Sequence, residues 1–196
     1  YRNMKADNIQ KKVYDDSFSH NHDLSITGGT EKTKVLFAVN YTDEDGMKLA
    51  SYYKRANVSL KVNQKIAKNV DISLDTRYTN TKKMGDEGVR NGSGSVLSSS
   101  YRFRPIATEN ILGDLNAMNE GMIENYAKQS QWDRYNPVNR INDNYSPKDY
   151  QALRGILSLN WEIVKGLTYH SDLSLNQSWN QNKTWTGAIV NSYMDD

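Results

Sequence analysis

Two histidines near the N-terminus, His20 and His22, are the residues whose spacing most directly suggests chemistry. Alternate residues of a β-strand point to the same face, so both imidazoles would project together, as they do in a metal site. A metal site needs further ligands, and the sequence places no third ligand beside this pair. We therefore interpret the two histidines as structural residues at the end of a strand.

The acidic run 43–46, with the sequence DEDG, is a second candidate because it resembles a calcium-binding loop. The first and twelfth positions of an EF-hand would be Tyr41 and Tyr52, which are poor calcium ligands, so a turn built by Asp and Gly is the better interpretation.

The glycine-rich run 91–95 lacks the Gly-Lys-Ser/Thr of a phosphate-binding loop. The chain contains no cysteine, which excludes disulfides, thiolate catalysis and cysteine-based zinc sites. We expect no enzymatic activity, no catalytic residue, no metal and no cofactor.

Residues 81–150 form a long segment without strand alternation, and this segment contains all three prolines. Loops of this length are either functional or disordered. Asp114 would cap a short helix within the segment. Aromatic and arginine side chains in such a loop either stack on a sugar or anchor a partner, or else pack the loop on itself. The residues predicted to contact a ligand or partner are Trp132, Arg134, Tyr135, Arg140 and Tyr145.

Outside this segment, apolar and polar residues alternate with the period of two that is typical of β-strands. Val58 and Leu60 would share one face of a strand, while Ser59 and Lys61 would share the other. The alternation predicts an all-β, antiparallel fold with six strands, at about 18–27, 32–42, 53–64, 70–80, 151–163 and 167–180.

The connections between the predicted strands alternate in length. Those near residues 29, 67 and 165 are tight, whereas the connection over 81–150 is long. Short turns on one side and long loops on the other are typical of transmembrane β-barrels, in which lipid-facing and lumen-facing side chains alternate. The side chains expected to face lipid are Val35, Phe37, Val39, Val58, Leu60, Ile72, Leu74, Leu159 and Leu173. The aromatic girdle residues expected at the two membrane interfaces are Tyr41, Tyr78, Trp161, Tyr169 and Trp179.

The charge of the chain excludes one class of partner. A formal net charge of +2 over 196 residues, with no run of Lys or Arg, does not indicate a nucleic-acid partner. No apolar run is long enough for a transmembrane helix, but closed barrels cross membranes with strands, and membrane lipid is the partner that the alternation predicts.

Six strands cannot close a wide barrel and would leave two open edges, so we expect this chain to be part of a larger barrel wall. The expected organisation is the end of a loop at 1–17, four barrel strands at 18–80, a long extracellular loop with a short helix at 81–150, two barrel strands at 151–181, and the start of the next extracellular loop at 182–196.

The stretch HNHDLSITGGTEKT, followed by the YTDEDG loop and the YKR strand, resembles the barrel signature of SusC/RagA-like TonB-dependent transporters of the Bacteroidota. The NPV at 136–138 and EIVKGLTYHSD at 162–172 fit the later part of the same pattern, so the resemblance covers roughly residues 18–180. It implies a plugged barrel of the 22-stranded type, in the bacterial outer membrane, that imports oligosaccharides (glycans) or peptides. It also implies a SusD-like surface lipoprotein as a partner, and a TonB complex that engages a plug region not contained in this chain.

A soluble β-sandwich that binds carbohydrate is the alternative, because the strands of antiparallel sandwiches alternate with the same period. In such a module the apolar face would be turned inward, against a second sheet.

Overall fold

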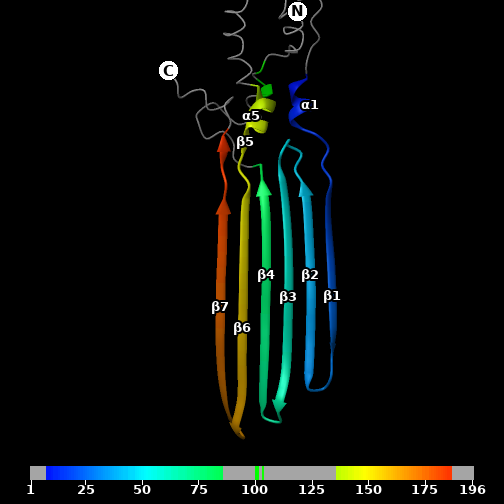
Figure 1. The fold of residues 1–196 in the computed structure, drawn as a ribbon. Helices are drawn as coiled ribbons and strands as arrows, with labels where there is room; N and C mark the ends of the chain where they lie inside the picture. The colour runs from blue at the N-terminus through cyan, green and yellow to red at the C-terminus, as the bar shows by residue number, and fades with distance from the viewer. Residues whose placement is uncertain (1–7, 86–99, 102, 104–135, 187–196) are drawn as a thin grey trace, which may run out of the picture.

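The computed structural model describes residues 8–85, 100–101, 103 and 136–186. Long antiparallel strands make up most of this part of the chain, and two short helices lie beyond one end of them (Figure 1). The elements are α1 Ile9–Val13, β1 Ser19–Gly29, β2 Thr33–Asp45, β3 Tyr52–Ala67, β4 Val70–Met84, α5 Pro137–Asp143, β5 Asn144–Tyr145, β6 Lys148–Val164, β7 Leu167–Asn182 and β8 Trp185–Thr186.

The six long strands form one sheet in the order β1-β2-β3-β4-β6-β7, and each neighbouring pair is antiparallel. Glycine is required at the tight β1–β2 turn, because a Cβ on Gly29 would lie 2.1 Å from the Thr33 carbonyl oxygen. Gly166, in the β6–β7 turn, has a φ of 91°, which L side chains rarely adopt. Within the described residues, β1 and β7 pair on one side only, so the sheet is open at both edges.

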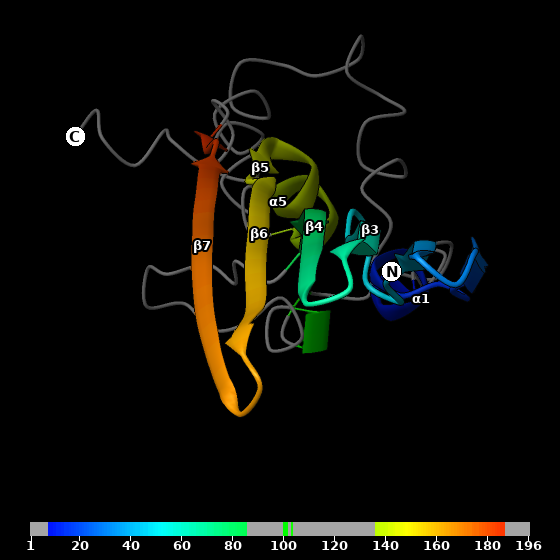
Figure 2. The same cartoon turned by 90° about the horizontal axis from the view of Figure 1, so that it is seen from below.

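The sheet is a single layer, as the view along the strands shows (Figure 2). Every residue of the six long strands is exposed or half-buried, and none is buried. A sandwich would bury one face of this sheet against a second sheet. Among the described residues the only other sheet is the two-stranded pair β5–β8, so nothing here forms the second layer that the sandwich alternative requires.

All six long strands extend beyond the predicted ranges at one end at least, and three of these extensions enter the acidic run 43–46 or the segment 81–150. β2 continues through Asp45, so the acidic residues expected in a turn belong to a strand. β4 continues to Met84 and β6 begins at Lys148, so strand pairing extends into both ends of the segment 81–150. Polar residues at these ends remain paired because backbone hydrogen bonds between strands do not depend on side-chain polarity. The helix expected after Asp114 lies outside the described residues.

Helices α1 and α5 pack together beyond the strand ends and form the only buried apolar cluster of the described residues. Asn136 caps α5, because its side chain accepts a hydrogen bond from the backbone N–H of Val138 at 3.0 Å, and proline follows at the first helical position. The rim cluster, as we call it, consists of Ile9, Val13 and Phe103, with Tyr14, Val138 and Ile141 packed against it. No helix in the described part of the chain is long and apolar enough to cross a membrane.

Candidate functional site: a two-faced strand wall

The strand register gathers the predicted lipid-facing residues on one face of the sheet, which we call the apolar face. Phe37 lies directly opposite Leu60, and Ile72 lies directly opposite Leu159. None of these apolar residues is buried: six of the nine are half-buried, and the exposed fraction of Leu173 reaches 69%. An apolar surface of this extent on a soluble protein would favour association, so it marks a surface made to contact lipid or protein.

The predicted girdle residues lie at two levels of the apolar face. Tyr41 and Trp179 belong to one register row that crosses the whole sheet, and Tyr78 lies two residues closer to the turns. Trp161 and Tyr169 lie directly opposite each other at the turn end. All five are exposed.

The separation of the two aromatic levels matches the thickness of a membrane. Tyr169 and Trp179 are 179 − 169 = 10 residues apart on β7, which corresponds to ~34 Å along a strand. With a barrel-like tilt of about 40°, this length would span ~26 Å, close to the apolar band of about 25 Å in outer-membrane barrels.

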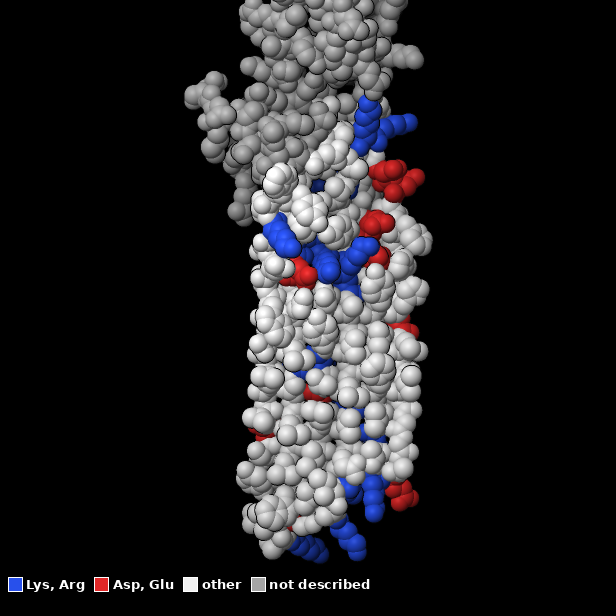
Figure 3. All heavy atoms as spheres, viewed as in Figure 1, with Lys and Arg blue, Asp and Glu red and all other residues white. Residues whose placement is uncertain are grey.

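Charged side chains avoid the middle of one sheet face and gather at its ends. Figure 3 shows Lys, Arg, Asp and Glu concentrated near the upper and lower ends of the strands, with a nearly uncharged region between them. A charge at the bilayer centre is costly, whereas charges at the interface contact water and headgroups. The distribution is therefore the one expected of a membrane-facing surface.

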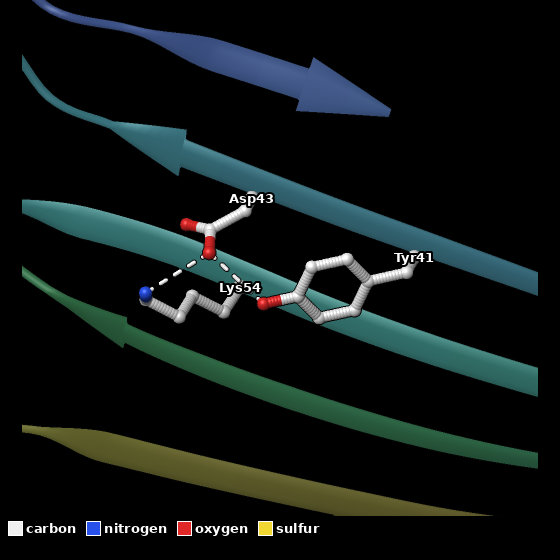
Figure 4. A network of polar contacts seen from close by, with 3 residues as sticks. All are labelled: Tyr41, Asp43 and Lys54. Carbon is white, nitrogen blue, oxygen red and sulfur yellow. Dashed lines mark hydrogen bonds and ion pairs between the residues drawn. The ribbon is translucent and has the colours of Figure 1, made fainter. Parts of the chain in front are cut away.

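A row of four charged residues crosses the apolar face at the loop end, and we call it the charged row. Its members are Asp43, Lys54, Lys82 and Asp149, each directly opposite the next on neighbouring strands. The Lys54 ammonium and the Tyr41 hydroxyl both donate to one oxygen of Asp43, at 3.0 Å and 2.9 Å (Figure 4). These two hydrogen bonds lower the pKa of the Asp43 carboxyl, which lies beyond the loop-end aromatic level.

His20 and His22, which the sequence suggests as possible metal ligands, take part in ring contacts. The ring centroids of His20 and His22 are 5.0 Å apart, and those of His20 and Phe18 are 5.7 Å apart. His20 also contacts the Tyr41 ring, at 6.0 Å. Among the described residues no group of three or more histidine or carboxylate side chains is arranged to hold a metal ion. The pair therefore extends the loop-end aromatic level onto β1.

The opposite face, which we call the polar face, carries a hydrogen-bonded chain of side chains across β1 to β4. The Asn40 amide donates to Asp23 at 2.7 Å, and its carbonyl oxygen accepts from the Asn57 amide at 3.0 Å. The Thr79 hydroxyl donates to the Asn57 carbonyl oxygen at 2.9 Å. This amide ladder, consisting of Asp23, Asn40, Asn57 and Thr79, satisfies polar groups between strands and leaves a hydrophilic surface.

The residues predicted for ligand contact are only partly described. Trp132, Arg134 and Tyr135 lie outside the described residues, and Arg140 lies on α5 with a side chain that is not described. Tyr145 lies on β5, directly opposite Trp185 of β8, and the two side chains are 49% and 67% exposed.

Sequence reasoning missed three features of this wall. The charged row was missed because Lys82 and Asp149 fall in the segment predicted to be a loop, although extending the alternation two residues beyond Asn80 would have placed Lys82 on the apolar face. The amide ladder depends on register, which alternation does not specify. Trp185 was missed because its partner strand is two residues long.

Two curated proteins of Formosa agariphila are similar to this chain in sequence. TonB-dependent receptor P39 is 29% identical over 157 residues, which cover 78% of this chain and 13% of the receptor. TonB-dependent receptor P3 is 28% identical over 100 residues, which cover 49% of this chain and 10% of the receptor. The matched segments thus cover only about a tenth of the length of these relatives. No family model matches the sequence.

Solved structures of the RagAB peptide importer share the fold. The importer in its open-open state matches with a TM-score of 0.64 and 14% identity, covering 94% of this chain and 21% of the solved chain. The closed-closed state matches with a TM-score of 0.63 over the same shares.

Sequence and fold lead to the same group of proteins. The resemblance to SusC/RagA-like TonB-dependent transporters is confirmed, and so is the antiparallel barrel-wall fold. TonB-dependent receptors and the RagAB importer are outer-membrane proteins.

Proposed function

We propose that this chain, which resembles SusC/RagA-like TonB-dependent transporters of the outer membrane, forms part of the wall of an importer barrel. In this arrangement the apolar face contacts lipid and the polar face lines the lumen. Further strands pair with the open edges of β1 and β7 and close the barrel. The chain contributes to import by enclosing a path and performs no catalysis itself.

The observation that carries this proposal is the single-layer sheet with two different faces. Its apolar face is uncovered and bounded by aromatic residues at two levels, and its polar face carries the amide ladder. A sheet of a soluble protein would cover the apolar face, whereas a barrel wall leaves it to the bilayer. Tyr145 and Trp185 then lie at the extracellular end, where the long loops emerge.

The cargo and partners are proposed from the relatives. Because the solved structures of similar fold are of a peptide importer, we propose that the full-length protein imports peptides or oligosaccharides. A SusD-like lipoprotein would cover the extracellular end, and a TonB complex would energise transport through a plug.

In an importer of this kind, Tyr145 and Trp185 are the described residues best placed to contact cargo. They are exposed aromatic side chains directly opposite each other, and such a pair can stack on a sugar ring or an apolar peptide side chain. Trp132, Arg134, Tyr135 and Arg140 remain proposed contacts from the sequence.

The facial assignment can be tested directly because this chain contains no cysteine. Single cysteines in place of Val58 and Ser59 would be spin-labelled in the full-length protein, with any other cysteine replaced, and reconstituted in lipid. We expect the label at 58 to be relaxed by oxygen, which dissolves in lipid, and the label at 59 by a water-soluble nickel complex. The opposite result would reverse the two faces.

Import itself needs a separate experiment. A strain that lacks the full-length protein should lose uptake of defined peptides or oligosaccharides and recover it on complementation. Unchanged uptake of every cargo tested would contradict an importer role for those cargoes.

A further inference from the structure

The charged row contains two lysines side by side at its centre. Lys54 of β3 lies directly opposite Lys82 of β4, with Asp43 beside the first and Asp149 beside the second. Like charges directly opposite each other on neighbouring strands repel. The two flanking aspartates offset this repulsion in the wall alone, and an anion between the two ammonium groups would offset it further.

Each lysine is held on its outer flank by a carboxylate. The Lys54 ammonium is 3.0 Å from Asp43, and the Lys82 ammonium is 3.9 Å from Asp149. The side chains of Lys54 and Lys82 nevertheless stay 44% and 57% exposed. An ammonium has three donors, so each lysine retains donors for a ligand after bonding its aspartate.

The position of this lysine pair specifies the kind of anion. Lys54 is four residues from Val58 and Lys82 is four residues from Tyr78, so both project from the apolar face. Asp43, directly opposite Lys54, lies two residues beyond Tyr41 on β2, which is ~7 Å further along the strand. Aromatic girdles lie at the headgroup level of a membrane, so the pair reaches the depth of the headgroups.

We propose that Lys54 and Lys82 bind the phosphate of an anionic lipid headgroup in the leaflet at the loop end of the barrel. This proposal rests on the proposed function, because it needs the apolar face to contact lipid. Asp43 and Asp149 position the two lysines, and the exposed ring of Tyr41 packs against the lipid below the phosphate. The site would anchor the wall at a defined depth in the membrane.

The test uses the full-length protein, purified in detergent, with phosphatidylglycerol as the anionic lipid and diacylglycerol as a lipid without phosphate. Native mass spectrometry would count bound lipids for the wild type and for the double variant Lys54→Gln/Lys82→Gln. The control, Lys34→Gln/Lys61→Gln, removes the same charge from the polar face.

We expect the wild type and the control to retain phosphatidylglycerol and the double variant to bind it about 30-fold more weakly, because each lysine near an anionic lipid contributes to binding. Diacylglycerol binding should not differ between them. Equal retention by all three proteins, or an equal loss in the control, would overturn the site. Displacement of the lipid by millimolar inorganic phosphate would make it a general anion site and overturn the lipid assignment.

Two further measurements separate this proposal from the proposed function. Circular dichroism would confirm that both variants fold. We expect the double variant to import cargo at the wild-type rate, because neither lysine faces the lumen. Normal import combined with unchanged lipid binding would therefore reject the lipid site and leave the importer proposal standing.

Discussion

The long sheet and the rim cluster differ in whether they bury their apolar side chains. The sheet exposes leucine, valine and isoleucine along its whole length and buries none of them. The rim cluster contains few residues, yet Val13 is fully buried and Ile9 is 5% exposed. The sheet therefore depends on its surroundings to remove apolar area from water, whereas the rim cluster forms a small core from its own chain.

This contrast predicts which substitutions should change stability only in the presence of a membrane. A change on the apolar face of the sheet should matter only where lipid is present, because in the proposed function that face contacts lipid. A change in the rim cluster should matter equally in lipid and in detergent, because its partners are side chains of the same chain.

The largest expected effect is that of Leu60→Arg in the full-length protein. Leu60 lies directly opposite Phe37, in a register row that reaches Leu175 about midway between the two aromatic levels. The substitution places a cation on the apolar face near the middle of the proposed membrane-facing band, and we expect it to lower the free energy of unfolding by about 2 to 4 kcal/mol. Chemical denaturation in lipid vesicles would measure the change.

The matched control for that substitution is its neighbour, Ser59→Arg. This arginine would point from the polar face into a hydrated lumen, so its effect should be much smaller. Equal unfolding midpoints for the two variants in lipid would contradict the facial assignment and remove the contrast between sheet and rim cluster.

A smaller and more local effect is expected for Val13→Ala. Removing two methyl groups from a fully buried side chain should cost about 2 kcal/mol. We expect faster hydrogen exchange in α1 and α5, with the exchange of β1 to β7 unchanged, because the cluster lies outside the sheet.

The control in the same helix is Lys11→Ala, at an exposed position of α1. It should leave exchange in α5 unchanged. If Val13→Ala accelerated exchange throughout the sheet, the rim cluster and the sheet would be one cooperative unit rather than two.

The sequence predicted the faces of the sheet better than its ends or its rim. Alternation is a local property, so Val58 and Ser59 could be assigned to opposite sides without knowledge of any neighbouring strand. The pairing of Lys82 with Asp149 joins residues 67 positions apart (149 − 82 = 67), so it depends on strand register.

The rim cluster was unpredictable for a related reason. Ile9 and Phe103 meet through tertiary contacts, and no local pattern indicates that they do. Helix α5 did carry a local signal, because Asn136 followed by Pro137 is a typical helix start. The motif was interpreted only as part of a family resemblance, and the helix was therefore missed.

The smallest effect is expected on the polar face of the sheet, for Asn40→Ala in the amide ladder. This change removes the hydrogen bonds of Asn40 to Asp23, Asn21 and Asn57. Because the partners can bond to water in a hydrated lumen, we expect a loss of only about 1 kcal/mol of unfolding free energy in lipid.

A double-mutant cycle with Asn57→Ala separates the ladder from the general cost of losing polar side chains. If the two asparagines act through their 3.0 Å hydrogen bond, the double variant should lose less stability than the two single variants together, with a coupling of about 0.5 to 1 kcal/mol. Strictly additive losses would mean that the two amides contribute independently. The polar face would then be merely hydrophilic, and the register of the wall would be held by backbone pairing alone.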